Sequence, residues 1–149
     1  MDLAGNHIGA TGAHCLATLR DAPELKSIHL GLSYNFIDDD AVLALATLGQ
    51  TPKLTTLSLA LGWNDSIGDA GAEALAALRY AMRLTALNLE LWSTRIRASG
   101  VRALATLRDA PSLAKFTLRL EGNGIGDSGG RALATLKNAK SLTSLDLGL

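Results

Sequence analysis

The sequence predicts an α/β solenoid of about five strand–helix repeats of 29 residues, and three observations support this fold class. A leucine that opens each repeat recurs at intervals of 29, 30, 29 and 29 residues. Each repeat then has a run in which apolar residues alternate with others, which is typical of a strand with one buried face. Farther along, the apolar spacing becomes three to four, which is typical of a helix. A fixed period of this length indicates a solenoid in which each repeat packs on its neighbours.

The repeat starts lie near Leu25, Leu54, Leu84, Leu113 and Leu142, with a partial repeat before the first. The extra residue of the 30-residue interval falls within residues 63–67, which predicts a loop insertion there. Each helix should begin at a polar cap. We expect these caps to be Asp39, Asp69 and Asp127, each in its own repeat, with Thr11 and Ser99 capping one residue later in the other two.

Two further columns of equivalent residues are expected to be structural. An asparagine follows the strand at Asn6, Asn35, Asn64 and Asn123, where its amide would bond buried loop backbone. Thr94 interrupts this column and should satisfy the loop less completely. Cys15 stands where the other repeats place a small alanine, so we expect a buried, unreactive thiol.

Composition excludes several classes of function. The 149 residues suit one domain, and 14 basic residues balance 14 acidic ones, so nucleic acids and anionic membrane surfaces are not expected partners. No stretch approaches the roughly 20 apolar residues of a membrane span. A single cysteine excludes an internal disulfide, and the N-terminus lacks the pattern of a signal peptide. We therefore expect a cytoplasmic protein.

No motif supports catalysis, a cofactor or a metal. Gly124, Gly126 and Gly129 match a dinucleotide-binding pattern, but two of these glycines are simply repeat glycines, so a repeat turn is the better interpretation. The acidic run 38–40 has no complete set of oxygen ligands, and the three histidines have no metal-ligand spacing. We expect a protein that is not an enzyme.

The repeated patterns Leu-x-x-Leu-x-Leu, Asn-x-Ile-Gly-Asp-x-Gly-Ala and Ala-Leu resemble the leucine-rich repeats of the ribonuclease-inhibitor-like class along the whole chain. The resemblance implies a right-handed, horseshoe-like arc with a parallel sheet on the concave face and α-helices on the convex face. It also implies about seven buried apolar side chains per repeat, each large one contributing roughly 2 kcal/mol. This chain departs from the family in one further strand leucine, such as Leu61, which lengthens the strand. Members of the class mostly bind proteins.

Residues that the repeat does not dictate are the candidates for binding a partner. Three of the six aromatic residues gather at one rim of the expected sheet, and charges occupy the later strands. Glu90 and Arg119 are expected to be neighbours that can pair. The full set of candidates is Tyr34, Trp63, Trp92, His29, Asn88, Glu90, Lys115, Arg119 and Asp146. Exposed Trp and Tyr favour a binding role, but the aromatic residues would also fit a structural role in shielding the asparagine loops.

These features predict a module, residues 1–149, that binds another protein on the concave sheet and the aromatic rim. The alternatives are a regulatory or sensor segment of a larger enzyme or receptor, and a self-assembling structural repeat. The chain starts near the end of one strand, at Leu3, and stops at the equivalent Leu149, without polar capping repeats. Three interpretations follow: part of a longer array, which we favour, a homo-oligomer through its uncapped ends, or a minimal repeat protein.

Overall fold

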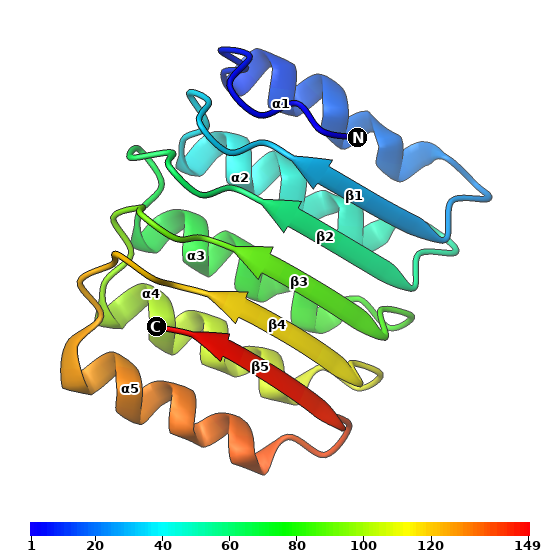
Figure 1. Ribbon diagram of the computed structural model, residues 1–149. Helices are drawn as coiled ribbons and strands as arrows, with labels where there is room; N and C mark the ends of the chain where they lie inside the picture. The colour runs from blue at the N-terminus through cyan, green and yellow to red at the C-terminus, as the bar shows by residue number, and fades with distance from the viewer.

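The computed structural model describes residues 1–149 and has two layers, a parallel sheet and a row of helices (Figure 1). The five strands are β1 (Ser27–Gly31), β2 (Thr56–Ala60), β3 (Ala86–Glu90), β4 (Lys115–Arg119) and β5 (Ser144–Gly148). The helices are α1 (Ala10–Ala17), α2 (Asp39–Ala46), α3 (Asp69–Ala76), α4 (Ala98–Leu104) and α5 (Gly126–Ala134). Each continues into a short 3₁₀ segment: η1 (Thr18–Asp21), η2 (Thr47–Gln50), η3 (Ala77–Tyr80), η4 (Ala105–Asp109) and η5 (Thr135–Asn138). The predicted solenoid is confirmed.

The strands lie in the sheet in sequence order, β1-β2-β3-β4-β5, and every neighbouring pair is parallel. The register pairs residues one repeat apart, so that Leu57 lies beside Ile28 on one side and Leu87 on the other. Because paired strands lie about 4.8 Å apart while packed helices need 8–10 Å, stacking such repeats bends the sheet side inward. The exposed sheet face is therefore the concave one.

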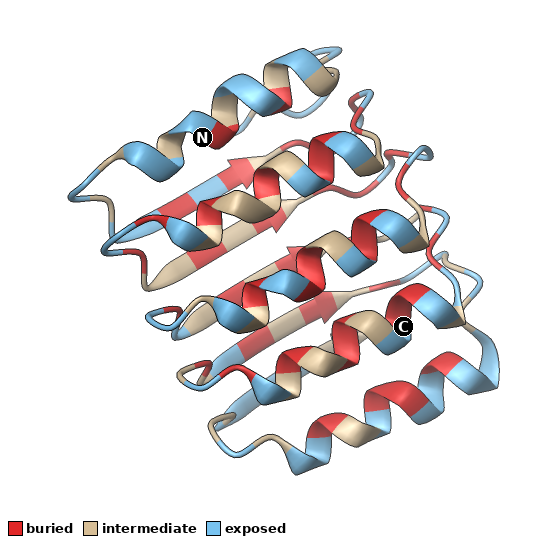
Figure 2. Ribbon diagram, turned by 180° about the vertical axis from the view of Figure 1, so that it is seen from behind, coloured by how far each residue is buried: buried red, intermediate tan, exposed pale blue.

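The core lies between the two layers and runs through all the repeats. In the central repeat seven large apolar side chains are buried, as expected: Leu54, Leu57, Leu59, Leu61, Ile67, Leu75 and Leu78. Viewed from the helix side, the buried positions follow the strands and the inner faces of the helices (Figure 2). Stability therefore comes mainly from contacts between neighbouring repeats.

A threonine marks the point where four of the five helices tighten into their 3₁₀ segments. The Oγ1 of Thr47 donates to the carbonyl of Ala44 at 2.7 Å, and Thr106 does the same to Ala103. This bond to a carbonyl three residues earlier satisfies a group that the α-helical pattern leaves open. The repeat that starts at Leu54 has Ala77 at this position and lacks the bond.

The helix caps differ from the prediction, because two of the aspartates cap the helix of the following repeat. Asp39 Oδ1 accepts hydrogen bonds from the N–H groups of Gly68 and Gly71 at the start of α3, both at 2.8 Å. The cap of its own helix α2 is Asp38, which accepts from the Ala41 N–H. These bonds tie successive repeats together along the helix layer.

Asp69 caps α4 in the same way. It accepts from the backbone N–H groups of Arg97 (2.8 Å) and Gly100 (2.9 Å) and from the Ser99 hydroxyl. Burial alone would raise the pKa of Asp69, but these hydrogen bonds and the charge of Arg97 hold it below its ordinary value. The prediction that Ser99 caps its own helix is therefore wrong, because Ser99 donates to Asp69 instead.

The remaining cap predictions are also wrong. α1 begins after Gly9 and α5 after Ile125, and neither has a side-chain cap, so neither Thr11 nor Asp127 has this role. The preceding repeat offers no carboxylate to α5, because Ala98 stands where α3 has Asp69. In the capped junctions a glycine makes room, since a Cβ at Gly100 would lie 2.6 Å from Asp69 Oδ1.

At Asn35, Asn64 and Asn123 the asparagine column forms a hydrogen-bonded ladder, as predicted, but the exposed side chain of Asn6 donates only to the Ala4 carbonyl of its own loop. Asn64 donates to the carbonyls of Leu32 (2.9 Å) and Leu61 (2.8 Å), and its Oδ1 accepts from the N–H groups of Asn35 and Ile37, both at 3.1 Å. Each such side chain therefore bonds its own loop and the loop of the repeat before it. We call Asn35, Asn64 and Asn123 the asparagine ladder.

Thr94 interrupts the ladder at the place where the loop insertion falls. Its hydroxyl bonds Leu91 O and Asn123 Oδ1, but it has no amide oxygen to accept from the preceding loop. There the Ile67 N–H donates to the Asn64 carbonyl of its own loop (3.1 Å). The insertion and the missing asparagine are thus two parts of one local change.

The expectation of a buried Cys15 is wrong, because the side chain is exposed. The equivalent Ala44 and Ala74 line the spaces between their own helix and the helix before it. No helix precedes α1 in the structure, and only Ala13 and Ala17 of α1 are buried.

No helix of the structure has the length and apolarity that crossing a membrane requires. No cluster of metal-ligating side chains is present.

Candidate protein-binding surface

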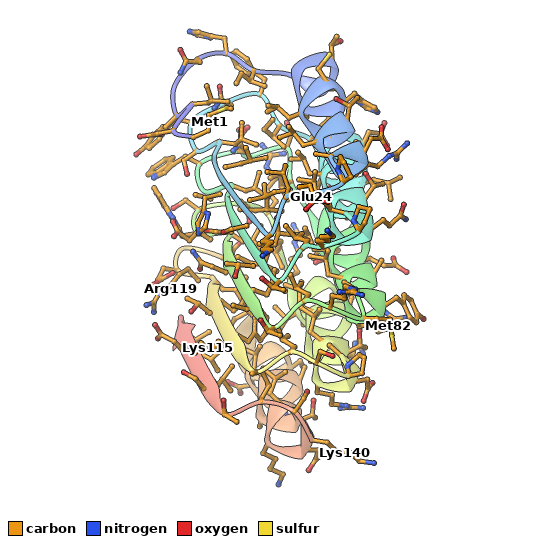
Figure 3. All side chains as sticks on the ribbon, turned by 90° about the vertical axis from the view of Figure 1, so that its right-hand side faces the viewer. Met1, Glu24, Met82, Lys115, Arg119 and Lys140 are labelled. Carbon is orange, nitrogen blue, oxygen red and sulfur yellow. The ribbon has the colours of Figure 1, made fainter.

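The exposed sheet face carries the predicted columns of side chains. The register places Asn88 between Ser58 and Thr117, and Glu90 between Ala60 and Arg119. These residues alternate with the buried strand leucines, so their side chains project from the face opposite the helices. Arg119 and Lys115 lie on this side of the molecule (Figure 3).

Asn88 lies at the centre of this face and is only partly satisfied. Its Nδ2 donates to Ser58 Oγ and to Glu90 Oε1, both at 3.0 Å. Its Oδ1 is inaccessible and accepts no hydrogen bond. This oxygen therefore carries the cost of a buried acceptor that is left unpaired.

Glu90 and Arg119 are neighbours in the sheet, but they do not form the predicted ion pair. Arg119 Nη2 instead contacts Asp146 Oδ2 of the next strand at 2.6 Å, and Glu90 accepts from Asn88. The reason is Gly148, which lies beside Arg119 and has no side chain to block it. A Cβ at Gly148 would lie 2.7 Å from Arg119 Cδ.

Tyr34, Trp63 and Trp92 form one cluster, which we call the aromatic rim. The rings of Tyr34 and Trp63 are stacked, with centroids 5.3 Å apart and planes 13° apart. Trp92 meets both edge-on, with centroids 6.1 Å from Tyr34 and 6.2 Å from Trp63. Tyr34 remains 56% exposed and Trp63 50% exposed, so the cluster presents ring surface to solvent while its members hold each other in place.

Two members of the rim have an unfavourable backbone conformation. Tyr34 and Trp63 both have φ of +55°, in the left-handed region. The equivalent residues in the other three repeats are Gly5, Ser93 and Gly122, with φ of +69°, +51° and +73°. The loop therefore requires left-handed backbone, which glycine adopts freely and a bulky residue adopts at a cost of roughly 1–2 kcal/mol.

Trp92 connects the rim to the charged part of the face. Its indole lies over Gly62, where an added Cβ would be only 2.6 Å from Trp92 Cδ2. On its other side is a hollow of about 490 Å³, lined by Glu90, Trp92, Ser93, Arg119, Glu121 and Gly122. Apolar ring surface, two carboxylates and a guanidinium thus border one depression.

The structure brings some of the predicted residues together and separates others. Trp92, Glu90 and Arg119 meet in the hollow, and Tyr34 and Trp63 adjoin Trp92. His29 is exposed on β1, with Nδ1 3.1 Å from Ser27 Oγ. Lys115 is exposed at the start of β4 and does not line the hollow, so it lies apart from the rim.

The sequence prediction missed Phe36 on this side of the loops, whereas it counted Glu121 among the charges that could orient a partner. Glu121 lines the hollow, and Phe36 is 66% exposed with its ring centroid 5.3 Å from that of His7. The signal for Phe36 is its position between the ladder asparagine and the following isoleucine. The first and fifth of these loops have His7 and Gly124 there.

Comparisons with known proteins agree with this architecture. A family model described as Leucine Rich repeat matches residues 1–17, 52–76 and 117–134. A solved structure named "Leiomodin-1 Actin-Binding Site 2 (ABS2)" is similar at a TM-score of 0.65 and 18% sequence identity, over 92% of this chain and 78% of that chain. At this identity the similarity concerns the fold. A comparison with curated proteins found no match.

Proposed function

We propose that residues 1–149 are a protein–protein interaction module that binds a partner protein on the concave sheet, with the aromatic rim as its anchor. The observation that carries this proposal is the left-handed backbone of Tyr34 and Trp63. Glycine occupies this position in two other repeats without strain, so the two large rings cost stability where glycine would not. A binding role explains why exposed rings stand there.

The rest of the surface suits a protein partner. Aromatic rings that are held in place by each other lose little conformational entropy on binding, and Trp and Tyr are the residues most enriched at binding hot spots. The hollow beside Trp92 would accept a side chain that has an apolar body and a polar end. Asp146 and Arg119 would orient the partner.

The comparisons support a protein partner in general terms. The similar leiomodin structure is, by its name, an actin-binding site. We carry over from it only the kind of function, because 18% identity does not transfer a partner.

We also infer that the repeats are of the ribonuclease-inhibitor-like class, because each pairs one strand with one α-helix in about 29 residues. An intracellular setting would suit the exposed thiol of Cys15.

The test is a pull-down that compares the wild type with a rim variant, Trp63→Gly plus Trp92→Ser. The proposal expects proteins that are retained by the wild type and lost with the variant. A purified candidate would then be titrated while the tryptophan emission is followed, because both tryptophans of the chain lie in the rim. A partner retained equally by both proteins, with unchanged emission on binding, would contradict the proposal.

A further inference from the structure

On the helix side of the molecule, opposite the exposed sheet face, an open groove of about 470 Å³ lies between α2 and α3. It is bordered by α2 and η2 on one side and by α3, η3 and the loop to β3 on the other. Three large apolar side chains stand at its edges, Leu43 (57% exposed), Tyr80 (68%) and Met82 (68%). Met82 lies on the helix side, away from the sheet residues Lys115 and Arg119 (Figure 3).

The apolar character of this groove is a local departure from the repeat. At five positions of the repeat the other repeats have mostly polar or charged side chains. In this repeat pair the side chain at each of these positions is apolar or, at Gly49, missing. Leu43 replaces His14, Glu73, Arg102 or Arg131; Gly49 replaces Arg20, Arg79, Arg108 or Lys137; Ala77 replaces Thr18, Thr47, Thr106 or Thr135; Tyr80 replaces Asp21, Gln50, Asp109 or Asn138; and Met82 replaces three prolines and Lys140. All five residues line the same groove.

At the next junction an arginine spans the equivalent space. There Arg79 reaches across from η3, and its Nη1 donates to the Ala76 carbonyl and to Thr106 Oγ1, both at 3.3 Å. In the groove the counterpart of Arg79 is Gly49, and the counterpart of Thr106 is Ala77. Both the bridging side chain and its acceptor are therefore missing at this junction alone.

The only charged residue that lines the groove is Arg83. It takes part in none of the ion pairs of the molecule. Arg79 adds a second positive charge behind Tyr80, with its guanidinium 4.3 Å from the ring centroid. No carboxylate lines the groove, so the field at its edge favours a negatively charged occupant.

We propose that this groove is a second interaction surface, which binds an acidic amphipathic helix of a partner protein. The apolar face of the helix would lie against Leu43, Tyr80 and Met82, and a carboxylate would meet Arg83. A flexible methionine at the edge suits a surface that adapts to a peptide. An enclosed small ligand fits less well, because such sites bury most of the ligand surface and these edge side chains are largely exposed.

The two methionines of the chain supply the measurement. Protein carrying ¹³C in the methionine methyl groups gives two NMR signals, from Met82 at the groove and from Met1 far from it. The probe is a synthetic helical peptide with leucines on one face and glutamates on the other, titrated beside a scrambled peptide of equal composition and a version with lysine for glutamate. We expect the glutamate peptide to shift the Met82 signal and to leave Met1 unchanged.

Two variants locate the effect. Gly49→Arg restores the side chain that the other repeats have, and it should weaken binding at least about tenfold. A Cβ there would lie 2.7 Å from Leu78 Cδ2, the end of a flexible side chain, so the fold should accommodate it. Arg83→Glu changes only an exposed charge, and it should reverse the preference toward the lysine peptide.

Several outcomes would overturn the proposal. One is the absence of any shift of the Met82 signal at glutamate-peptide concentrations up to about 1 mM, because a dissociation constant of about 1 mM is the weakest affinity of interest. A second is equal binding by Gly49→Arg. A shift caused by dodecanoate but not by the peptide would indicate a small amphiphile, and a shift that grows with protein concentration alone would indicate a second copy of the chain. Trp63→Gly should leave the shift intact, so this test is independent of the aromatic rim.

Discussion

The asparagine ladder and the aromatic rim are adjacent in sequence, yet they differ in almost every physical respect. Tyr34 precedes Asn35, and Trp63 precedes Asn64. The asparagines are buried, and their side chains bond the loops of two repeats. Tyr34 and Trp63 are half exposed or more, and their backbone has positive φ.

Within one loop, therefore, the residue that stabilises the fold and the residue that we propose for binding are adjacent in sequence. The ladder position has one solution, because the loop carbonyls and N–H groups need an amide that both donates and accepts. At the rim the loop requires only a left-handed backbone, and glycine meets that requirement at the lowest cost. A large exposed aromatic residue at this left-handed position therefore carries information about binding, whereas a departure from asparagine at the ladder carries information about stability.

The largest expected effect is the loss of stability on Asn64→Ala. The substitution leaves the Leu61 carbonyl and the N–H groups of Asn35 and Ile37 without their partner in a buried loop. The Leu32 carbonyl loses one of its two donors and keeps the bond from Asn35 Nδ2. We expect the free energy of unfolding to fall by about 3–5 kcal/mol, since each buried unpaired group costs roughly 1–3 kcal/mol and relaxation recovers part. Urea unfolding at neutral pH measures this change.

Asn6→Ala is the matched control for the ladder. Asn6 is exposed, and its Nδ2 makes one bond, to the Ala4 carbonyl (3.1 Å). Its loss should change the free energy of unfolding by less than about 0.5 kcal/mol. If Asn6→Ala and Asn64→Ala were equally destabilising, the burial of the ladder would not be the source of its importance.

The second effect concerns the capping of one repeat by another. Asp69→Ala removes the acceptor for the first turn of α4, and we expect a loss of about 1–2 kcal/mol at pH 7. Because the pKa of Asp69 in the folded state lies below its ordinary value of 3.8, its contribution is present above that value and is lost as the pH falls through the folded-state pKa.

Unfolding of wild type and Asp69→Ala at pH 7 and at pH 3 or below measures this dependence. The difference between the two proteins should be largest at pH 7 and should shrink in acid. A difference that stays constant down to the lowest pH would mean that the carboxylate charge is not what stabilises α4. Asp127→Ala is the control, because Asp127 caps no helix in the structure, and it should have little effect at either pH.

These caps also show where prediction from sequence succeeds and where it fails. Periodicity predicted the strands, the helices and the register, because burial of leucines one repeat apart leaves a single consistent stacking. It assigned Asp39 and Asp69 to their own helices, because local cap rules consider one helix at a time. The actual bonds run 28 to 32 residues along the chain, and only the offset between stacked helices determines them.

The candidate site was predictable in part for a related reason. Counting positions within the repeat placed Tyr34, Trp63 and Trp92 together, since neighbouring strands bring equivalent residues side by side. It did not predict that Arg119 turns to Asp146, because that choice depends on the space over Gly148. The groove at Gly49 was not predicted, because the sequence marks it only by departures from the repeat at five positions of the helix layer, which come together only when the helices stack.

A smaller gain in stability is expected from extending the ladder with Thr94→Asn. An amide oxygen at position 94 would accept from the Asn64 N–H, as Asn64 accepts from the Asn35 N–H at 3.1 Å. We expect the free energy of unfolding to rise by about 1 kcal/mol, the usual net contribution of one such bond. Urea unfolding tests this. A loss of stability would show that the inserted residue near Asp65 prevents the loop from meeting the ladder.

The smallest effect on stability, and the sharpest test of the contrast, is expected at Trp63. Glycine would release roughly 1–2 kcal/mol of left-handed strain, while the loss of stacking on Tyr34 costs about 0.5–1.5 kcal/mol, so Trp63→Gly should leave the free energy of unfolding within about 1 kcal/mol of wild type. Trp63→Ala loses the stacking and keeps the strain, so it should be less stable than Trp63→Gly, which reverses the usual order of these two residues. Both variants should lose the partner that the rim binds. If alanine proved the more stable replacement, the backbone would not be strained by the native ring, and the argument that tryptophan is kept there for binding would fail.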